Sequence, residues 1–415
     1  MSNDLPITTK IIRQPWEDIR VRVIIRAFYE DAYLDFFIRY YAALGFDTIT
    51  VLKADDDKFK YTPPVLDYGL SASGHTPIIE IIPVANEGND ILLTHYKHYA
   101  DKSYNWILNI DADEFLIIDL GLYPTGIKEF IYKIGQRIAT TKNIPGADAI
   151  QQIKFRWMCI NKLNNRSPPE LKQEYIVNKS LLPENVDTQQ ILPQSFAGYF
   201  MTNKLELYKY IKSMCNTKWA NNTGLINAHF FYPIPHTNGR NYNLLDGYFK
   251  GVNNSDPRYF PNNGTMLMDG YILHLNTRSL ANSVTKCLVT RLRDNKKIKD
   301  PVAFQQLING YTQPTNTAAI HELKQKFADQ LNSKGYFPVK IRQFHAKLGK
   351  FINAENWQRP LRNMLIAGSS SDNQFGELIQ STAVCNQELE WQILSDLCVA
   401  NNLNPDNMRA IINLF

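Results

Sequence analysis

The sequence has few cysteines, and their spacing fits no cysteine-based scaffold. Only five of the 415 residues are cysteine, and no two of them form a C-x-x-C pair. A disulfide framework needs an even set of cysteines at close spacing, and a structural zinc site needs close pairs of Cys or His ligands. Both scaffolds are therefore excluded, and a reducing compartment is the simplest expectation.

Long apolar runs are also missing. No segment approaches the roughly 20 apolar residues that a membrane-spanning helix needs. Residues 1–16 do not show the charged and then apolar pattern of a secretory signal peptide. We therefore expect a cytoplasmic protein that is not secreted.

A strong excess of one charge is absent as well. Forty-five Lys and Arg against 40 Asp and Glu give a net charge of +5, too small for a dedicated nucleic-acid binder. Two stretches are locally basic, residues 286–299 and 334–350. On helices they would suit peripheral contact with an anionic membrane, and a solvated helical face explains them equally well. Nucleic acid is not an expected partner, and the sequence defines no oligomeric state.

The chain is longer than a usual single domain. Its 44% hydrophobic and 20% charged residues are typical of a globular protein. We expect a catalytic domain over residues 1–290, a helical extension over 291–366, and a linker with a small helical tail over 367–415. In that tail, Asn404 and Pro405 supply an N-cap and a first-turn proline.

Strand-like and helix-like segments alternate through the first part of the chain. The predicted strands are 21–28, 46–52, 77–84, 105–110, 148–158, 205–214, 225–232 and 265–275, and the predicted helices are 33–44, 91–100 and 126–138. Gly45 is a natural C-terminal cap for the first helix. The polar stretch 161–194 is expected to be a loop. This alternation predicts an α/β fold with a mostly parallel central sheet and helices on both faces, followed by a helical C-terminal region.

The sharpest local signal is an acidic cluster directly after a hydrophobic strand. Asp111, Asp113 and Glu114 follow the apolar run that ends at Ile110. In an open parallel sheet, ligands bind outside the carboxyl ends of the strands. Two carboxylates two residues apart can share Mg²⁺ or Mn²⁺, which usually also takes oxygens from a phosphate ligand. The alternative is a solvated acidic turn, and the position before Phe115 favours a functional site.

These residues resemble the nucleotide-sugar glycosyltransferases of GT-A fold, and among them the family 2-like and family 92 group with a D-x-D-E-F motif. Residues 111–115 match that motif as they stand. Weaker matches to the family lie on both sides of this motif, over about 265 residues and in the order that the family has them. They are Arg26, 33–37, Tyr40, 44–47, 155–157, 210–213, 229–230 and 274–286. The resemblance implies a GT-A, Rossmann-like fold. It also implies metal-dependent transfer of a sugar from a nucleotide-sugar donor to a hydroxyl of a glycan, lipid-linked saccharide or protein. The expected donor is a UDP-sugar.

The charge that develops during sugar transfer suggests a role for each residue of the acidic cluster and for His274. The departing nucleoside diphosphate becomes more negative as the glycosidic bond breaks, so a divalent ion on its phosphates stabilises the transition state. Asp111, Asp113 and His274 are the predicted ligands of Mn²⁺ or Mg²⁺, with Asp113 in direct contact. Asp111 would act through water or bind ribose, and Glu114 would orient the metal shell or the sugar hydroxyls. His274 resembles the late histidine that completes the site in several GT-A enzymes, and a structural role at a strand end is its alternative.

The remaining candidates surround this centre. Nucleotide-sugar contacts are predicted for Arg26, Asp55, Asp56, Asp111, Glu114, Lys212 and Arg278. Lys212 and Arg278 would neutralise phosphate or else are solvated charges. The inverting displacement that the resemblance implies needs a base for the acceptor hydroxyl. Asp269 and His229 are the candidates for this base, with Glu206 as a third.

The sequence also departs from the family pattern, and two rival functions stay open. Family members commonly follow the second strand with an Asp-Asn pair, whereas this chain has Lys53-Ala54-Asp55-Asp56-Asp57. One rival is a nucleotidyltransferase or phosphotransferase, which would need a glycine-rich phosphate loop after the first strand. Residues 26–30 contain no glycine. The other rival is a noncatalytic glycan-binding or scaffold protein on the same fold.

Overall fold

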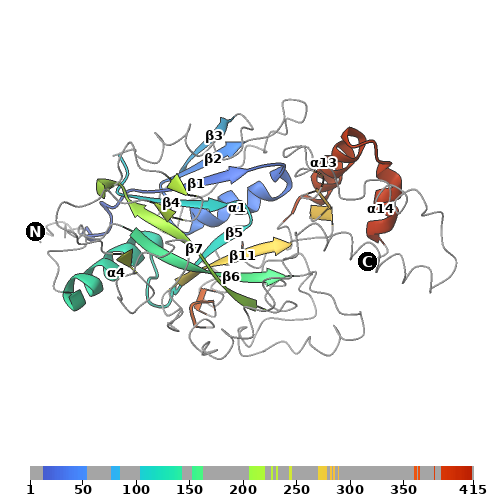
Figure 1. Ribbon diagram of the computed structural model, residues 1–415. Coiled ribbons are helices and arrows are strands. Elements are labelled where there is room, and N and C mark those ends of the chain that lie inside the picture. Colours follow the sequence, from blue (N-terminus) through green and yellow to red (C-terminus); the bar gives the residue numbers. More distant parts are fainter. Residues whose placement is uncertain are drawn as a thin grey trace, which may run out of the picture.

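Figure 1 shows the computed structural model of the chain. It describes residues 13–53, 76–84, 103–142, 152–161, 205–219, 226–227, 230–231, 243–244, 270–277 and 385–413, and single positions within 281–288, within 359–364 and at 378. The predicted helix 91–100 and residues 162–194 of the predicted loop 161–194 lie outside these residues, and Asn161 belongs to a strand.

One mixed sheet organises the described part of the chain. There, nine strands stand in the order β3-β2-β1-β4-β7-β6-β11-β5, with β10 beside β6. They are β1 (Val21–Ala27), β2 (Thr48–Lys53), β3 (Ile78–Pro83), β4 (Trp106–Asp111), β5 (Glu114–Ile118), β6 (Gln152–Asn161), β7 (Leu205–Asn216), β10 (Asn243–Leu244) and β11 (Gly270–Thr277). Of these strands, only β7 and β5 run against the others. The predicted α/β class with a mostly parallel central sheet is confirmed.

Each predicted strand that falls on described residues is present with shifted ends, and two regions differ in kind. The predicted strand 225–232 is a separate pair of short strands, β8 (Ile226–Asn227) and β9 (Phe230–Phe231), which pair antiparallel with each other. Strand β5 is not predicted, because its apolar run is only four residues long and follows acidic residues typical of a turn. A short 3₁₀ helix, Thr217–Trp219, ends β7.

Alternate residues of the central strands belong to two apolar layers. Val23 and Ile25 of β1 join the main core together with helices α1 (Asp31–Ala43) and α4 (Ile127–Lys142). Ile24 lies in a second, smaller cluster, as expected from the two-residue repeat of a strand. No described helix contributes to that second cluster. The prediction of helices on both faces is thus borne out for one face of the described sheet.

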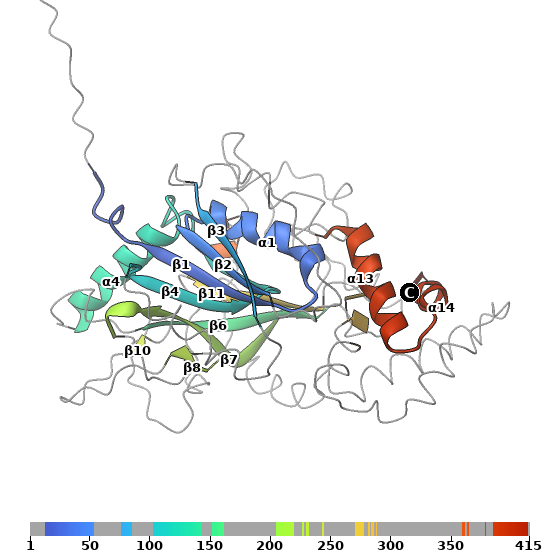
Figure 2. The same ribbon diagram turned by 90° about the horizontal axis from the view of Figure 1, so that it is seen from above.

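Two glycines with positive φ lie where the end of α1 meets the start of α4. Gly45 has a φ of +91°, as expected for the predicted cap of α1. Gly126 has a φ of +92°, and a Cβ there would lie 2.3 Å from the carbonyl oxygen of Leu44. The same carbonyl accepts the Ile127 N–H at 2.9 Å. Both helices contribute residues to the same core cluster and so lie on the same face of the sheet (Figure 2).

The C-terminal helices α13 (Gln387–Ala400) and α14 (Pro405–Asn413) lie at the end of the sheet toward which β11 points (Figure 1). The predicted N-cap is confirmed, since Asn404 Oδ1 accepts the N–H of Asp406 at 2.8 Å. The Asn386 N–H donates to the Ala32 carbonyl at 2.8 Å. Helix α13 is thereby attached to the first turn of α1. None of the helices in the described residues has the length and apolarity to cross a membrane.

Candidate active site

The candidate site lies at the edge where the parallel strands β1 and β4 end. Arg26 and Asp111 are register partners on these two strands. Their side chains reach each other, with Arg26 Nη2 3.8 Å from Asp111 Oδ1. About a third of each side chain is exposed, 30% for Arg26 and 33% for Asp111. A guanidinium and a carboxylate therefore face solvent together at the sheet edge where ligands bind in such folds.

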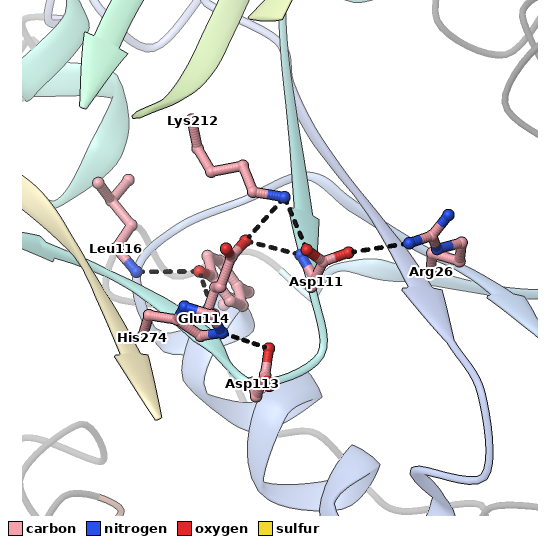
Figure 3. A network of polar contacts seen from close by, with 8 residues as sticks. Arg26, Asp111, Asp113, Glu114, Leu116, Lys212 and His274 are labelled. Carbon is pink, nitrogen blue, oxygen red and sulfur yellow. Dashed lines mark hydrogen bonds and ion pairs between the residues drawn. The ribbon is translucent and has the colours of Figure 1, made fainter. Parts of the chain in front are cut away.

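A tight reversal after β4 brings the other acidic residues to the same place. Residues 112 and 113 form the turn between β4 and β5, which starts at Glu114. Strand β5 pairs antiparallel with β11, and Glu114 is the register partner of His274. A residue 160 positions later in the chain is thus set beside the acidic turn, as Figure 3 shows.

Lys212 of β7 contacts two of the carboxylates, those of Asp111 and Glu114. Its Nζ donates to Asp111 Oδ2 at 2.8 Å and lies 3.2 Å from Glu114 Oε2, and its side chain is only 1% exposed. Burial acts to lower the pKa of Lys212, and the charges of Asp111 and Glu114 outweigh it and raise that pKa. Burial likewise acts to raise the pKa of Asp111, and the cations Lys212 and Arg26 together lower it. Lys212 and Asp111 are therefore both charged.

Glu114 is the most deeply buried member of the network. Its side chain is 0% exposed, and its Oε2 accepts the Asp111 N–H at 2.8 Å. Burial raises the pKa of Glu114 to about 7, although the neighbouring Lys212 lowers it. Its other oxygen, Oε1, has no hydrogen-bond partner in the described part of the chain. Glu114 thus stabilises the turn through its hydrogen bond with the Asp111 backbone, and it has no exposed surface for a ligand.

Asp113 and His274 contact each other directly. Asp113 Oδ1 lies 3.3 Å from His274 Nε2, and their side chains are 8% and 12% exposed. Two neighbouring ligands of Mg²⁺ or Mn²⁺, each about 2.1 Å from the ion, lie about 3 Å apart, so the pair fits two ligand positions of one cation. No group of three Asp, Glu, His or Cys side chains that could hold a metal occurs in the described residues. Ligand or water oxygens would have to complete such a shell.

Five strands of the sheet bring six predicted residues into one network: Arg26, Asp111, Asp113, Glu114, Lys212 and His274 (Figure 3). The other candidates lie outside the described residues: Asp55, Asp56, His229, Asp269 and Arg278. The third base candidate, Glu206, lies on β7, where the structure describes the backbone alone. The basic stretch 334–350 and most of 286–299 also lie outside.

Sequence reasoning missed an ion pair at the same edge. Lys53, the last residue of β2, donates to Asp31 Oδ1 at 2.6 Å, and their side chains are 11% and 1% exposed. The pair ties the first residue of α1 to the end of β2, next to the strand that carries Arg26. An aspartate at the start of a helix and a lysine at the end of the next strand are the sequence signal that could have found it.

It also missed the part played by two tyrosines of α1. Tyr40 and Tyr41 belong to the main core, and both are 0% exposed. The Tyr41 hydroxyl donates to the Glu114 carbonyl at 3.0 Å, directly behind the acidic turn. A pair of tyrosines on a helix with an apolar face is a signal for buried hydroxyls that need partners.

Comparisons with known proteins give little beyond this geometry. No protein-family model and no curated protein sequence matches the chain. Among solved structures, the chain is similar to residues 1–349 of S. aureus TarS, with 12% identical residues, a TM-score of 0.25, and coverage of 95% of this chain and 90% of that one. A similarity at this level does not establish a shared activity.

Proposed function

We propose that this chain is a glycosyltransferase that uses a divalent cation to bind a nucleotide-sugar donor. One observation carries the proposal. Asp111, Asp113 and Glu114 meet His274 at the carboxyl edge of a mostly parallel sheet, where a phosphorylated ligand would lie. The donor nucleoside, expected to be uridine, follows from the family resemblance alone.

The charges of the network support the need for a cation. The ammonium of Lys212 is already in contact with Asp111 and Glu114. Arg26 is the remaining cation of the network with a substantial exposed fraction, 30%. A diphosphate brought next to Asp111 and Asp113 would be repelled. A bound Mn²⁺ or Mg²⁺ would offset that repulsion and act as a Lewis acid on the leaving diphosphate.

The chain's own residues then have distinct tasks. Asp113 and His274 would hold the cation, and Arg26 would contact the phosphates. Lys212 and Glu114 would keep Asp111 in place for water-mediated contact with the cation or for ribose. Asp269 and His229 stay the candidates for the base that deprotonates the acceptor hydroxyl, with inversion at the sugar carbon. The acceptor would be a glycan, a lipid-linked saccharide or a protein, and the basic stretches would suit peripheral contact with a membrane.

The loop after β1 disfavours the alternative function, that of a nucleotidyltransferase or phosphotransferase. Such an enzyme needs glycines there so that backbone N–H groups can surround a phosphate. Phe28, Tyr29 and Glu30 occupy that loop, and Tyr29 and Glu30 are buried. The loop is filled by side chains and offers no glycine backbone to a phosphate.

Donor turnover tests the proposal. The purified chain would be incubated with UDP-, GDP- and CMP-sugars, with Mn²⁺ or with EDTA, and release of the free nucleotide would be measured. We expect release from one donor class that requires Mn²⁺ and is lost in Asp113→Asn. If no donor is turned over in any condition while a nucleotide still binds, the noncatalytic binding protein becomes the better description.

A further inference from the structure

Strand β5 is the last strand of the sheet order, and half of its backbone N–H and C=O groups point away from its partner strand β11. It pairs with β11 through an antiparallel register that sets Glu114 opposite His274 and Leu116 opposite Ile272. In such a pair, the N–H and C=O groups of every second residue point to the open side. Glu114 and Leu116 are both 0% exposed, so water does not reach their open-side groups. These groups need partners from within the protein.

Two hydroxyls of α1 take the place of a neighbouring strand. The Tyr41 hydroxyl donates to the Glu114 carbonyl at 3.0 Å and accepts the Leu116 N–H at 2.9 Å. The Tyr40 hydroxyl donates to the Leu116 carbonyl at 2.7 Å. Three backbone groups on the open side of β5 are therefore satisfied by two adjacent tyrosines.

We infer that Tyr41 is a positioning residue for the acidic turn. Its hydroxyl fixes the backbone at Glu114, the residue directly after Asp113. On the other side of the turn, the Leu275 N–H donates to the Asp113 carbonyl at 2.8 Å. The turn is thus held from β11 at one residue and from α1 at the next. The inference rests on the proposed function only for the identity of the ligand that the turn binds.

The tyrosine ring itself is anchored apart from its hydroxyl. The Tyr41 ring packs against Phe37 and Phe46, with ring centroids 4.6 and 5.3 Å apart. Tyr41→Phe therefore keeps the packing and removes only the link between α1 and β5. Metal–ligand distances in a formed site lie within about 0.2 Å of their standard values, and loss of an outer-shell contact that orients a ligand typically weakens metal binding by about 10-fold or more.

Tyr271→Phe is the matched control. Tyr271 lies on β11, three residues before His274, and is also 0% exposed. Its hydroxyl has no hydrogen-bond partner in the described part of the chain. The control removes a buried tyrosine hydroxyl close to the site without breaking a link to the turn.

The test measures Mn²⁺ affinity by titration in the presence of UDP, together with the His274 ring resonance in ¹H–¹³C NMR, assigned with His274→Gln. We expect Tyr41→Phe to bind Mn²⁺ about 10-fold more weakly and to shift the His274 resonance, while Tyr271→Phe changes neither. Wild-type affinity in a folded Tyr41→Phe would overturn the inference.

The NMR readout separates this inference from the proposed function. If the wild-type protein binds no Mn²⁺, the metal part of the proposed function fails. The His274 resonance then decides alone, because Asp113 lies 3.3 Å from its ring and a moved turn changes that contact. A shift in Tyr41→Phe and none in Tyr271→Phe supports the positioning role, and an unchanged resonance in both contradicts it.

Discussion

Replacing Lys212 by methionine removes the buried cation of the site and keeps most of its volume. The ammonium lies 2.8 Å from Asp111 Oδ2 and 3.2 Å from Glu114 Oε2. With an effective dielectric constant of about 20, these attractions amount to about 6 and about 5 kcal/mol before the cost of burying the ions. After that cost, removing one partner of a buried ion pair destabilises a protein by about 3–5 kcal/mol. We predict a loss of that size near pH 8.

The loss depends on pH because Glu114 can take up a proton. Its pKa is about 7 in the folded protein against 4.5 in the unfolded chain, so the folded state binds more protons between these values. Stability from this group is present below about pH 4.5 and falls by about 3 kcal/mol as the pH rises to 7. Without Lys212, the pKa of Glu114 rises further. The difference between Lys212→Met and wild type therefore grows above pH 7.

Urea denaturation at pH 6 and pH 8.5 measures both effects. Lys133→Met is the control, because Lys133 is 45% exposed and its buried partner Glu129 keeps two hydrogen bonds from Thr125. Its loss should stay within about 1 kcal/mol at either pH. If Lys212→Met is as stable as the control variant at pH 8.5, the buried charge network is not as described.

Three further predictions concern neighbouring contacts. Glu114→Gln should remove most of the fall in stability between pH 4.5 and 7, seen in urea denaturation across that range, and an unchanged pH profile would contradict the assigned pKa. Asp47→Asn should weaken the bond that Lys128 Nζ makes to Asp47 at 2.6 Å, lowering stability by about 1–3 kcal/mol in the same assay while nucleotide affinity stays unchanged. Tyr33→Phe should remove the hydrogen bond from Tyr33 to Glu390 and speed hydrogen exchange in α13, measured by mass spectrometry, and exchange at the wild-type rate would show that this contact does not hold α13.

The place of the acidic turn could be predicted from the sequence because it depends on local pattern. The apolar run 106–110 marks a buried strand, and acidic residues after it must lie at the carboxyl edge of a parallel sheet. Arg26 follows from the same reasoning one strand away. The N-cap at Asn404 is also a local signal, and the structure has it as predicted.

The contacts between distant strands could not be predicted in the same way. Lys212 lies 101 residues from Asp111, and its burial between two carboxylates depends on β7 pairing beside β4. A lysine in the middle of a strand gives no sign of this in the sequence. The hydrogen bonds of the Tyr41 hydroxyl could not be predicted either. Helical spacing predicts that the ring is buried, but it does not predict which backbone group the hydroxyl oxygen contacts.

Metal-dependent nucleotide binding tests the central claim most directly. Calorimetric titration with UDP, GDP and CMP, each with and without Mn²⁺, would be performed on wild type, Asp113→Asn and the control Asp35→Asn, whose carboxylate pairs with Arg39 on α1. We predict that one nucleotide binds only with Mn²⁺, that Asp113→Asn weakens it at least about 10-fold, and that the control matches wild type. Binding of no nucleotide, or equal binding by Asp113→Asn, would contradict the claim that the acidic turn forms a metal–diphosphate site.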